Sequence, residues 1–260
     1  MNRLLKATKA QTGSPILGAA AYSYDPIFIE VAARMGYRAA WIEMEHGFIT
    51  FAEAADLCRI ASGLGMVTMV RIPDARRENV LKAAECGPDI IDLPMANSAK
   101  DLEQLVRFAK FRPLGERGFF SVSRALEYGI DVNISDAQQQ LNGELCLMAQ
   151  IETVEALEKA EEICSVPGVD IFIGPADLSA SLDVPGQTGH SKVYAAAGKA
   201  IRIAKSHGKL VAVGSAPEDF EFYVSQGVDL LFCTNNIAAM KIGAQTVMKR
   251  ALAAMEKVVT

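Results

Sequence analysis

Short apolar runs alternate with amphipathic helical patterns along most of the chain. Eight of these runs are expected to be buried strands, at residues 15–22, 38–44, 66–71, 89–95, 144–151, 169–174, 209–214 and 228–233. Helical patterns follow them at residues 26–35, 51–62, 76–86, 98–111, 154–164, 193–207, 218–226 and 236–256. Eight uninterrupted strand–helix units are typical of a (β/α)8 barrel, whose parallel strands are buried on both faces.

Local signals mark where several of these helices begin. Asp25-Pro26 predicts a helix start with Asp as the N-cap, and Thr50 with Glu53 predicts a capping box. An open doubly wound sheet is the alternative fold, but no G-x-G-x-x-G follows the first strand, which weakens its dinucleotide-binding form. The sequence therefore predicts one (β/α)8 TIM barrel domain over residues 1–260.

Residues 112–134 and 180–192 interrupt the regular alternation of strands and helices. Loops of this length in a compact domain are usually functional, so both are expected to shape the pocket. A short helix is expected between the first of these loops and the fifth strand.

Composition narrows the class of protein. Half of the residues are apolar, which suffices for a large core, and the net charge of −5 argues against a nucleic-acid partner. The five cysteines are scattered and form no C-x-x-C pair, so neither a zinc knuckle nor a disulfide framework is indicated. With no secretory h-region and no apolar run of about 18 residues, we expect a cytoplasmic protein without a membrane partner.

Polar residues collect where the predicted strands end, which is where active sites lie in this kind of barrel. They are Glu43, Glu45 and His46 after the second strand, Arg71 after the third, Gln150 and Glu152 after the fifth, and residues 174–177 after the sixth. Packing alone does not account for polar groups that converge from four strands on one rim.

A pair of carboxylates stands out among these residues. Glu152, in Gln150-Ile151-Glu152-Thr153, and Asp177, in the run 174–179, each follow a buried strand, so their side chains should lie side by side. Hard divalent cations prefer such oxygen ligands. Either acid alone is equally well explained as a helix cap, but the pair favours a metal site.

His46 and Arg71 are the candidates for proton transfer and anion binding. Glu43 and Glu45 precede His46 closely, so a carboxylate can orient its ring and raise its basicity. Arg71 offers a fork of donors to a carboxylate or enolate oxygen, although an ion pair with Glu43 or Glu45 explains it equally.

Two common chemistries are not supported by the rim. No lysine ends a central strand there, which argues against a Schiff base. The loops at 214–217 and 234–236 are not glycine-rich phosphate cradles, so a plain carboxylate is favoured over a phosphorylated substrate.

Taken together, the motifs resemble the HpcH/HpaI aldolase family of metal-dependent pyruvate aldolases, over about residues 15–250. The resemblance is carried by Glu45-His46-Gly47, Arg71, Pro94-Met95, residues 113–118, Gln150-Ile151-Glu152-Thr153, Gly168-Val169-Asp170 and residues 174–179. It implies a TIM barrel of the phosphoenolpyruvate/pyruvate type with a swapped C-terminal helix. It also implies a homohexamer built as a trimer of dimers.

The resemblance implies roles for individual residues. Glu152 and Asp177 would bind Mg2+, Mn2+ or Co2+, and His46, Arg71 and Glu43 would be catalytic. Substrate contacts would come from Gln150, Gly174, Pro175, Ala176 and Ser179, and Glu85 would reach the site of a neighbouring subunit. The chain departs from the family by having Glu43 and Glu85 where Asp is usual. It also has Cys233-Thr234-Asn235-Asn236 where the eighth strand usually ends in Gly-x-Asp, and Phe119-Phe120 where smaller residues are common.

The expected function is metal-dependent cleavage of a 4-hydroxy-2-oxo acid to pyruvate and an aldehyde. A citramalyl- or malyl-CoA-type lyase is an alternative, for which Arg112, Arg117 and Arg124 in the long loop would offer charge. A barrel that binds 2-oxo acids without catalysis is a further alternative, motivated by Glu43 and by the end of the eighth strand.

Overall fold

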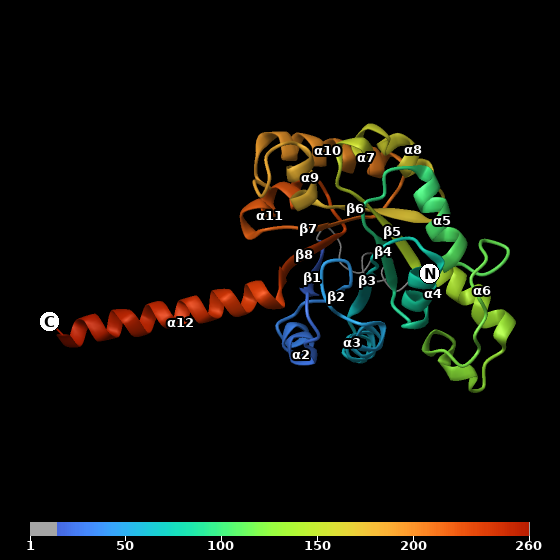
Figure 1. Ribbon diagram of the computed structural model, residues 1–260, viewed down its shortest axis with the longest axis horizontal. Helices are drawn as coiled ribbons and strands as arrows, with labels where there is room; N and C mark the ends of the chain where they lie inside the picture. The colour runs from blue at the N-terminus through green and yellow to red at the C-terminus, as the bar shows by residue number, and fades with distance from the viewer. Residues whose placement is uncertain (1–14, 260) are drawn as a thin grey trace.

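The computed structural model describes residues 15–259 and shows a closed barrel of parallel strands (Figure 1). The strands are β1 (Ile16–Ala21), β2 (Ala39–Glu43), β3 (Val67–Arg71), β4 (Ile90–Leu93), β5 (Cys146–Ile151), β6 (Val169–Ile173), β7 (Val211–Gly214) and β8 (Leu230–Asn235). They pair in sequential order, and β8 pairs with β1. This closure confirms the predicted (β/α)8 barrel and excludes the open sheet.

Helices follow the strands along the chain, and most of them surround the barrel (Figure 1). They are α2 (Pro26–Arg34), α3 (Phe51–Gly63), α4 (Arg77–Glu85), α5 (Ala99–Ala109), α6 (Ile134–Glu144), α7 (Val154–Glu158), α8 (Ala160–Ser165), α9 (Pro175–Ser181), α10 (Ser191–Ser206), α11 (Phe220–Ser225) and α12 (Asn236–Val259), with short 3-10 helices η1 (Arg124–Gly129) and η2 (Pro217–Asp219). The predicted cap at Asp25 and the capping box of Thr50 with Glu53 are both present. The single helix expected at 154–164 is divided at Lys159.

The long segment between α5 and β5 lies on the face of the barrel opposite to the strand ends that carry the polar residues. A helix that follows a parallel strand returns the chain to the start of the next strand. Accordingly, Arg124 in η1 donates to the backbone carbonyls of Cys86 and Gly87, at the C-terminal end of α4. The expectation that residues 112–134 shape the pocket is therefore wrong, whereas the expected helix before β5 is present as α6.

Two apolar layers make up the core. One lies between the strands and the helices, and the other fills the barrel. Inside the barrel, Trp41 meets the rings of Phe172 and Phe232 edge-on, each with a centroid separation of 5.2 Å. These three aromatic side chains form a rigid base for the pocket above them.

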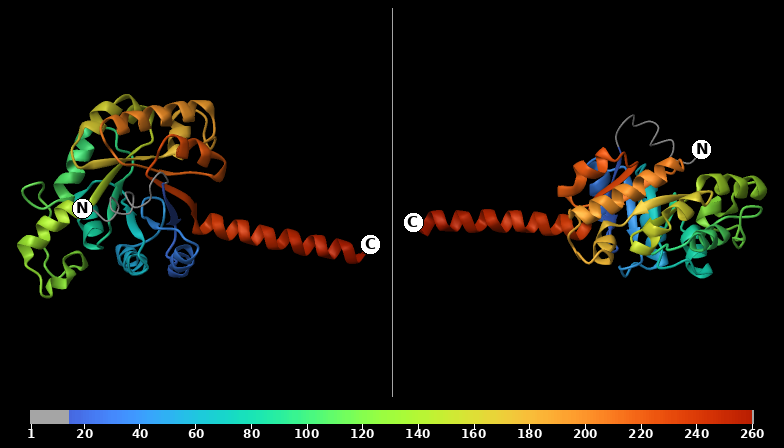
Figure 2. Two further views of the ribbon diagram at one scale, coloured as in Figure 1. Left: turned by 180° about the vertical axis from the view of Figure 1, so that it is seen from behind. Right: turned by 90° about the horizontal axis from the view of Figure 1, so that it is seen from above.

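The last helix, α12, projects away from the barrel (Figures 1 and 2). It exposes a series of large apolar side chains, namely Ile237, Met240, Ile242, Val247, Met248, Leu252 and Met255. No helix among residues 15–259 is long and apolar enough to cross a bilayer.

Candidate active site

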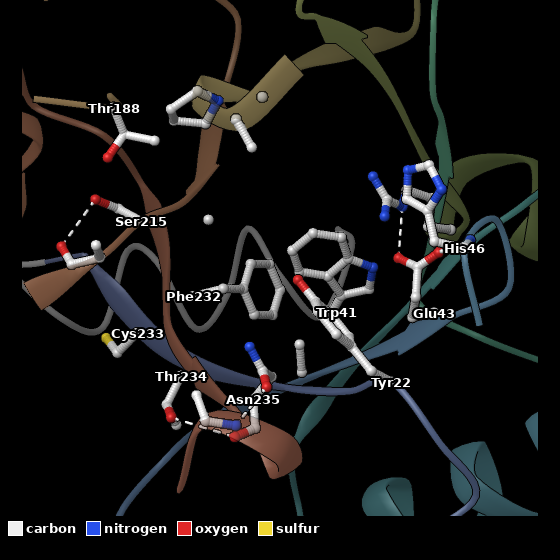
Figure 3. Close-up of a pocket in the computed structure, with 18 of the residues that line it drawn as sticks. Tyr22, Trp41, Glu43, His46, Thr188, Ser215, Phe232, Cys233, Thr234 and Asn235 are labelled. Carbon is white, nitrogen blue, oxygen red and sulfur yellow. Dashed lines mark hydrogen bonds and ion pairs between the residues drawn. The ribbon is translucent and has the colours of Figure 1, made fainter. Parts of the chain in front are cut away.

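A cavity of about 710 Å³ opens at the carboxyl ends of the strands (Figure 3). Every strand except β4 contributes to its lining. The cavity contains most of the polar residues that the sequence placed on this rim, including Glu43, His46, Arg71, Gln150 and Glu152. The convergence of the strand ends is thus confirmed.

Arg71 is held in place by two carboxylates. Its Nε donates to Glu43 Oε2 at 2.5 Å, and its Nη1 lies 3.0 Å from Glu45 Oε2. The guanidinium also lies over the ring of Trp41, 4.9 Å from its centroid. Both ion pairs that the sequence left open are therefore formed, and the Arg71 side chain, only 7 % exposed, is fixed at the edge of the cavity.

Of the two acids that the sequence offered to orient the His46 ring, Glu45 and not Glu43 forms an ion pair with the imidazole. Glu43 Oε1 accepts the backbone N–H groups of Glu45 and His46, at 2.7 and 2.9 Å, while Oε2 is occupied by Arg71. The His46 ring is 66 % exposed, and its Nε2 lies 3.5 Å from Glu45 Oε2. Glu43 therefore shapes the loop that carries His46, and Glu45 is the carboxylate beside the ring.

Glu152 is a buried carboxylate with one unsatisfied oxygen. Its Oε1 accepts the N–H of Met95 at 2.6 Å, whereas Oε2 has no hydrogen-bond partner. Burial raises the pKa of Glu152 to about 7; the Met95 bond opposes this shift, and the negative charge of Asp177 adds to it. A carboxylate in this environment is stabilised by a cation beside its free oxygen.

The donor set suits a hard divalent cation. Glu152 and Asp177 both line the cavity, Asp177 from the first turn of α9. Within residues 15–259 there is no group of three or more His, Cys, Asp and Glu side chains that could hold a metal. Ions such as Mg2+ retain several waters and commonly use one or two protein carboxylates, so two carboxylates are enough protein ligands for such an ion.

Gly174 makes room for the Glu152 carboxylate. A Cβ atom at position 174 would lie 2.8 Å from Glu152 Cβ and would collide with Oε2. Gly174, Pro175 and Ala176 line the cavity as predicted. Ser179 does not; it is fully buried, donates to the carbonyl of Ala176 and accepts the N–H of Gly186, so its predicted substrate contact is corrected to a structural one.

Asp92 is a site residue that the sequence reasoning missed. It is fully buried in β4 and accepts a hydrogen bond from Gln150 Nε2, while its Oδ1 has no partner. Gln150 Oε1 in turn faces Arg71 Nη1 at 3.4 Å. Burial raises the pKa of Asp92 well above its usual range. The signal that could have revealed it is a lone acid within the apolar run of β4.

Glu85 and the arginines of the long segment lie away from the cavity. Glu85 ends α4 and forms an ion pair with Arg117 at 2.9 Å. Arg117 is buried over the ring of Phe111, and Arg124 binds backbone carbonyls. Neither these residues nor Arg112 line the cavity. The contribution of Glu85 to a neighbouring subunit stays a prediction.

Comparison with known proteins gives consistent matches. The family model described as HpcH/HpaI aldolase/citrate lyase matches residues 21–232. A 2-keto-3-deoxy-L-rhamnonate aldolase of Escherichia coli O9:H4 (strain HS) is 33% identical over 182 residues, which is 69% of this chain and 67% of that protein.

Solved structures give the same assignment. An HpcH/HpaI aldolase from Desulfitobacterium hafniense DCB-2 is 31% identical with a TM-score of 0.86, covering 94% of this chain and 95% of the other. An HpcH/HpaI aldolase/citrate lyase family protein from Burkholderia cenocepacia J2315 has a TM-score of 0.88 at 24% identity, over 96% and 99% of the two chains, and shows the shared fold.

The fit of Gly174 against Glu152 gives a first prediction. Gly174→Ala should weaken Mn2+ binding about 10–100-fold, because the added methyl group displaces the Glu152 carboxylate. Isothermal titration with Mn2+ measures this change. Gly143→Ala in α6, where no atom lies within 4 Å of the added group, is the matched control and should bind as the wild type does. Equal affinity of the two variants would contradict the assignment of Glu152.

The buried pair of Asp92 and Gln150 gives a second prediction. Asp92→Leu should lower the free energy of unfolding by about 1–3 kcal/mol, because the buried amide of Gln150 loses its acceptor. Asp92→Asn keeps an acceptor and should be closer to the wild type. Urea denaturation of both variants measures the difference. If the Leu variant is at least as stable as the Asn variant, the proposed arrangement is wrong.

Proposed function

Because the chain belongs to the HpcH/HpaI aldolase/citrate lyase family, we propose that it is a divalent-metal-dependent aldolase. Its substrate is a 4-hydroxy-2-oxo acid, which it cleaves reversibly to pyruvate and an aldehyde. The observation that carries this proposal is the buried Glu152, which has one oxygen without a hydrogen-bond partner and lines the same cavity as Asp177 and the immobilised Arg71.

In the cleavage direction the bond between C3 and C4 of the substrate breaks. The proton of the 4-hydroxyl group leaves, C4 becomes the aldehyde carbon, and the electron pair of the broken bond passes to C3. The resulting enolate of pyruvate takes up a proton at C3 and becomes the methyl group. The site must therefore stabilise negative charge on the 2-oxo oxygen and accept one proton from the 4-hydroxyl.

Glu152 and Asp177 are the residues that would hold the cation, which is Mg2+, Mn2+ or Co2+. When bound, the ion supplies Lewis-acid stabilisation of negative charge on the 2-oxo group. Carboxylate oxygens accept all three ions, so the donor set favours none of them. The first-turn N–H groups of α9 lack intrahelical acceptors and border the cavity, so they are available to the substrate carboxylate.

Arg71 supplies a positive charge that does not have to reorganise during the reaction. Glu43 and Glu45 hold its guanidinium, and Asp92 orients the Gln150 amide so that its carbonyl group faces Arg71. Preorganised charge of this kind stabilises an enolate oxygen more effectively than mobile groups do. Asp92 and Glu43 are thus positioning residues.

His46 is the group that accepts the 4-hydroxyl proton. It lines the cavity, and its Nε2 lies 3.5 Å from Oε2 of Glu45, a carboxylate that can orient the ring. The neighbouring acid in this role is Glu45, since Glu43 is bonded to Arg71 and to the loop backbone.

The positions of the basic residues weaken the CoA-ester alternative. Arg117 and Arg124 are engaged at the opposite end of the barrel, and no arginine of the long segment lines the cavity. The non-catalytic alternative differs from the proposal in one property, which is proton exchange at the pyruvate methyl group.

We expect the protein to exchange the methyl protons of pyruvate for deuterium in D2O when Mg2+ or Mn2+ is present, and to lose this activity with EDTA. Glu152→Gln and Asp177→Asn should each lower the rate at least about a hundredfold, because both remove charge from the cation site. Proton NMR follows the exchange. Glu158→Gln, an exposed acid outside the cavity, is the matched control and should retain wild-type exchange.

Full exchange by the Glu152 and Asp177 variants would refute the metal assignment. Binding of pyruvate without any exchange by the wild type would favour the 2-oxo-acid-binding alternative.

The protein is also proposed to be a homo-oligomer, in which α12 of one copy packs on another. The exposed apolar face of α12 needs a partner, and α2 with its C-cap residue Met35 presents a matching stripe that also includes Ile27 and Val31. The last helix of a barrel ordinarily packs beside the first, so a swapped α12 explains both surfaces. The family resemblance suggests a hexamer, as a trimer of dimers.

Replacing Met248 and Leu252 by Glu should dissociate the assembly, because both side chains are exposed on α12, the helix that projects from the barrel (Figure 1). Sedimentation velocity measures the mass. Lys249→Glu changes an exposed charged position of the same helix and should leave the wild-type mass unchanged. A monomeric wild type, or a double variant with wild-type mass, would show that α12 has another role.

A further inference from the structure

The cavity has two chemically different halves. The charged side chains are Glu43 of β2, Arg71 of β3, Glu152 directly after β5 and Asp177 in the first turn of α9. The other half comes from β7, β8, β1 and the loop before α10, and it presents Thr188, Ser215, Thr234 and Asn235. Figure 3 shows Glu43 and His46 on one side and these neutral residues on the other, with Phe232 and Trp41 between them.

The hydroxyl groups of Thr188, Ser215 and Thr234 already donate their protons within the protein. Thr188 donates to Asp219 Oδ2 at 2.7 Å, Ser215 to the carbonyl of Ala216 at 3.1 Å, and Thr234 to the carbonyl of Asn235 at 3.4 Å. A hydroxyl that has donated its proton offers only lone pairs to a ligand. These hydroxyl groups therefore present acceptors, and Asn235, whose Oδ1 accepts the N–H of Ala238 at 2.8 Å, adds the Nδ2 amide as a donor. Such a mixed set suits a ligand hydroxyl group, which both donates and accepts, better than a carboxylate or phosphate oxygen, which only accepts.

The charged residues around the cavity also disfavour a second anion on the substrate. Among the described residues that line the cavity, Arg71 is the only lysine or arginine, and it is paired with Glu43 and Glu45. Behind Thr188 lies a further acid, Asp219, which is buried and also accepts the hydroxyl of Tyr194 at 2.6 Å. A second anion on the substrate would find no positive partner among the described residues of this half.

We propose that the half formed by β7, β8, β1 and Thr188 receives the aldehyde portion of the substrate and selects uncharged, hydroxylated aldehydes over those with a carboxylate or phosphate. The inference rests on the proposed aldolase function, because the charged half takes the 2-oxo acid end. Phe232 and Trp41 supply the apolar base along which the carbon chain lies.

Aldol addition of pyruvate to matched aldehydes tests the proposal. The pairs are glyceraldehyde against glyceraldehyde 3-phosphate, and butanal against succinic semialdehyde. We expect kcat/KM to favour the uncharged member of each pair at least about fivefold. The acids near this half repel a second anion on the aldehyde, and no described cation there can pair with it. A smaller or reversed preference in both pairs overturns the proposal.

Binding gives an independent readout, because Trp41 is the single tryptophan of the chain and lines the cavity. Its fluorescence is followed during titration with 2-oxopentanoate and with 2-oxoglutarate, which differ only in a distal carboxylate and lack the 4-hydroxyl needed for cleavage. We expect Kd to be at least about fivefold lower for 2-oxopentanoate. Equal affinities, or tighter binding of 2-oxoglutarate, overturn the proposal.

A variant locates the effect in the neutral half. Ser215→Arg should lower the Kd of 2-oxoglutarate and remove the preference, because it supplies the missing positive charge. Ser225→Arg adds the same charge on the exposed surface of α11, outside the cavity, and should keep the wild-type preference. If Ser215→Arg binds pyruvate normally but keeps the preference, the placement of the aldehyde is wrong.

Failure of the proposed function is distinguishable from failure of this inference. Absence of methyl-proton exchange by the wild type with pyruvate would concern the charged half alone and would overturn the aldolase assignment. Intact exchange together with efficient use of the charged aldehydes would overturn only the proposed preference for uncharged aldehydes.

Discussion

The unsatisfied carboxylate of Glu152 is the constraint on which the rest of the site depends. Burying a carboxyl group without partners for both oxygens is unfavourable, so its surroundings are adapted to it. Met95 adopts a left-handed φ of 51° where its N–H bonds Oε1, and position 174 has no Cβ, which leaves space beside Oε2. This adaptation is explained if the free oxygen of Glu152 binds a cation together with Asp177.

The positive charge of the site is equally constrained. Arg71 lies between two carboxylates, over an indole ring and beside an oriented amide, so its guanidinium has little freedom. Asp92 of β4 completes this arrangement, because it accepts a hydrogen bond from the Gln150 amide. The cost of burying these polar groups is offset by their mutual hydrogen bonds, and the benefit is a charge already placed for the developing enolate.

The division of the cavity connects substrate choice with assembly. The neutral half includes Ala238 and Ile242 of α12, the same helix that leaves the barrel with its apolar face exposed. Packing of α12 against a second copy would hold that wall of the cavity in place. Aldehyde specificity and oligomeric state are thus expected to depend on one another, whereas Arg71, Glu152 and Asp177 at the 2-oxo end all belong to the barrel and its helix α9.

The sequence by itself determined the eight strand–helix units, their order and the polar residues at the strand ends, because apolar periodicity and helix caps are local properties. Which groups pair was decided only by the tertiary structure. Glu43 binds Arg71 and not the His46 ring, and Ser179 bonds backbone groups away from the cavity. Pairing depends on the twist and stagger of neighbouring strands, which set side-chain directions that no linear spacing encodes. For the same reason, the lone acid of β4 acquired a role only when closure of the barrel placed it against Gln150.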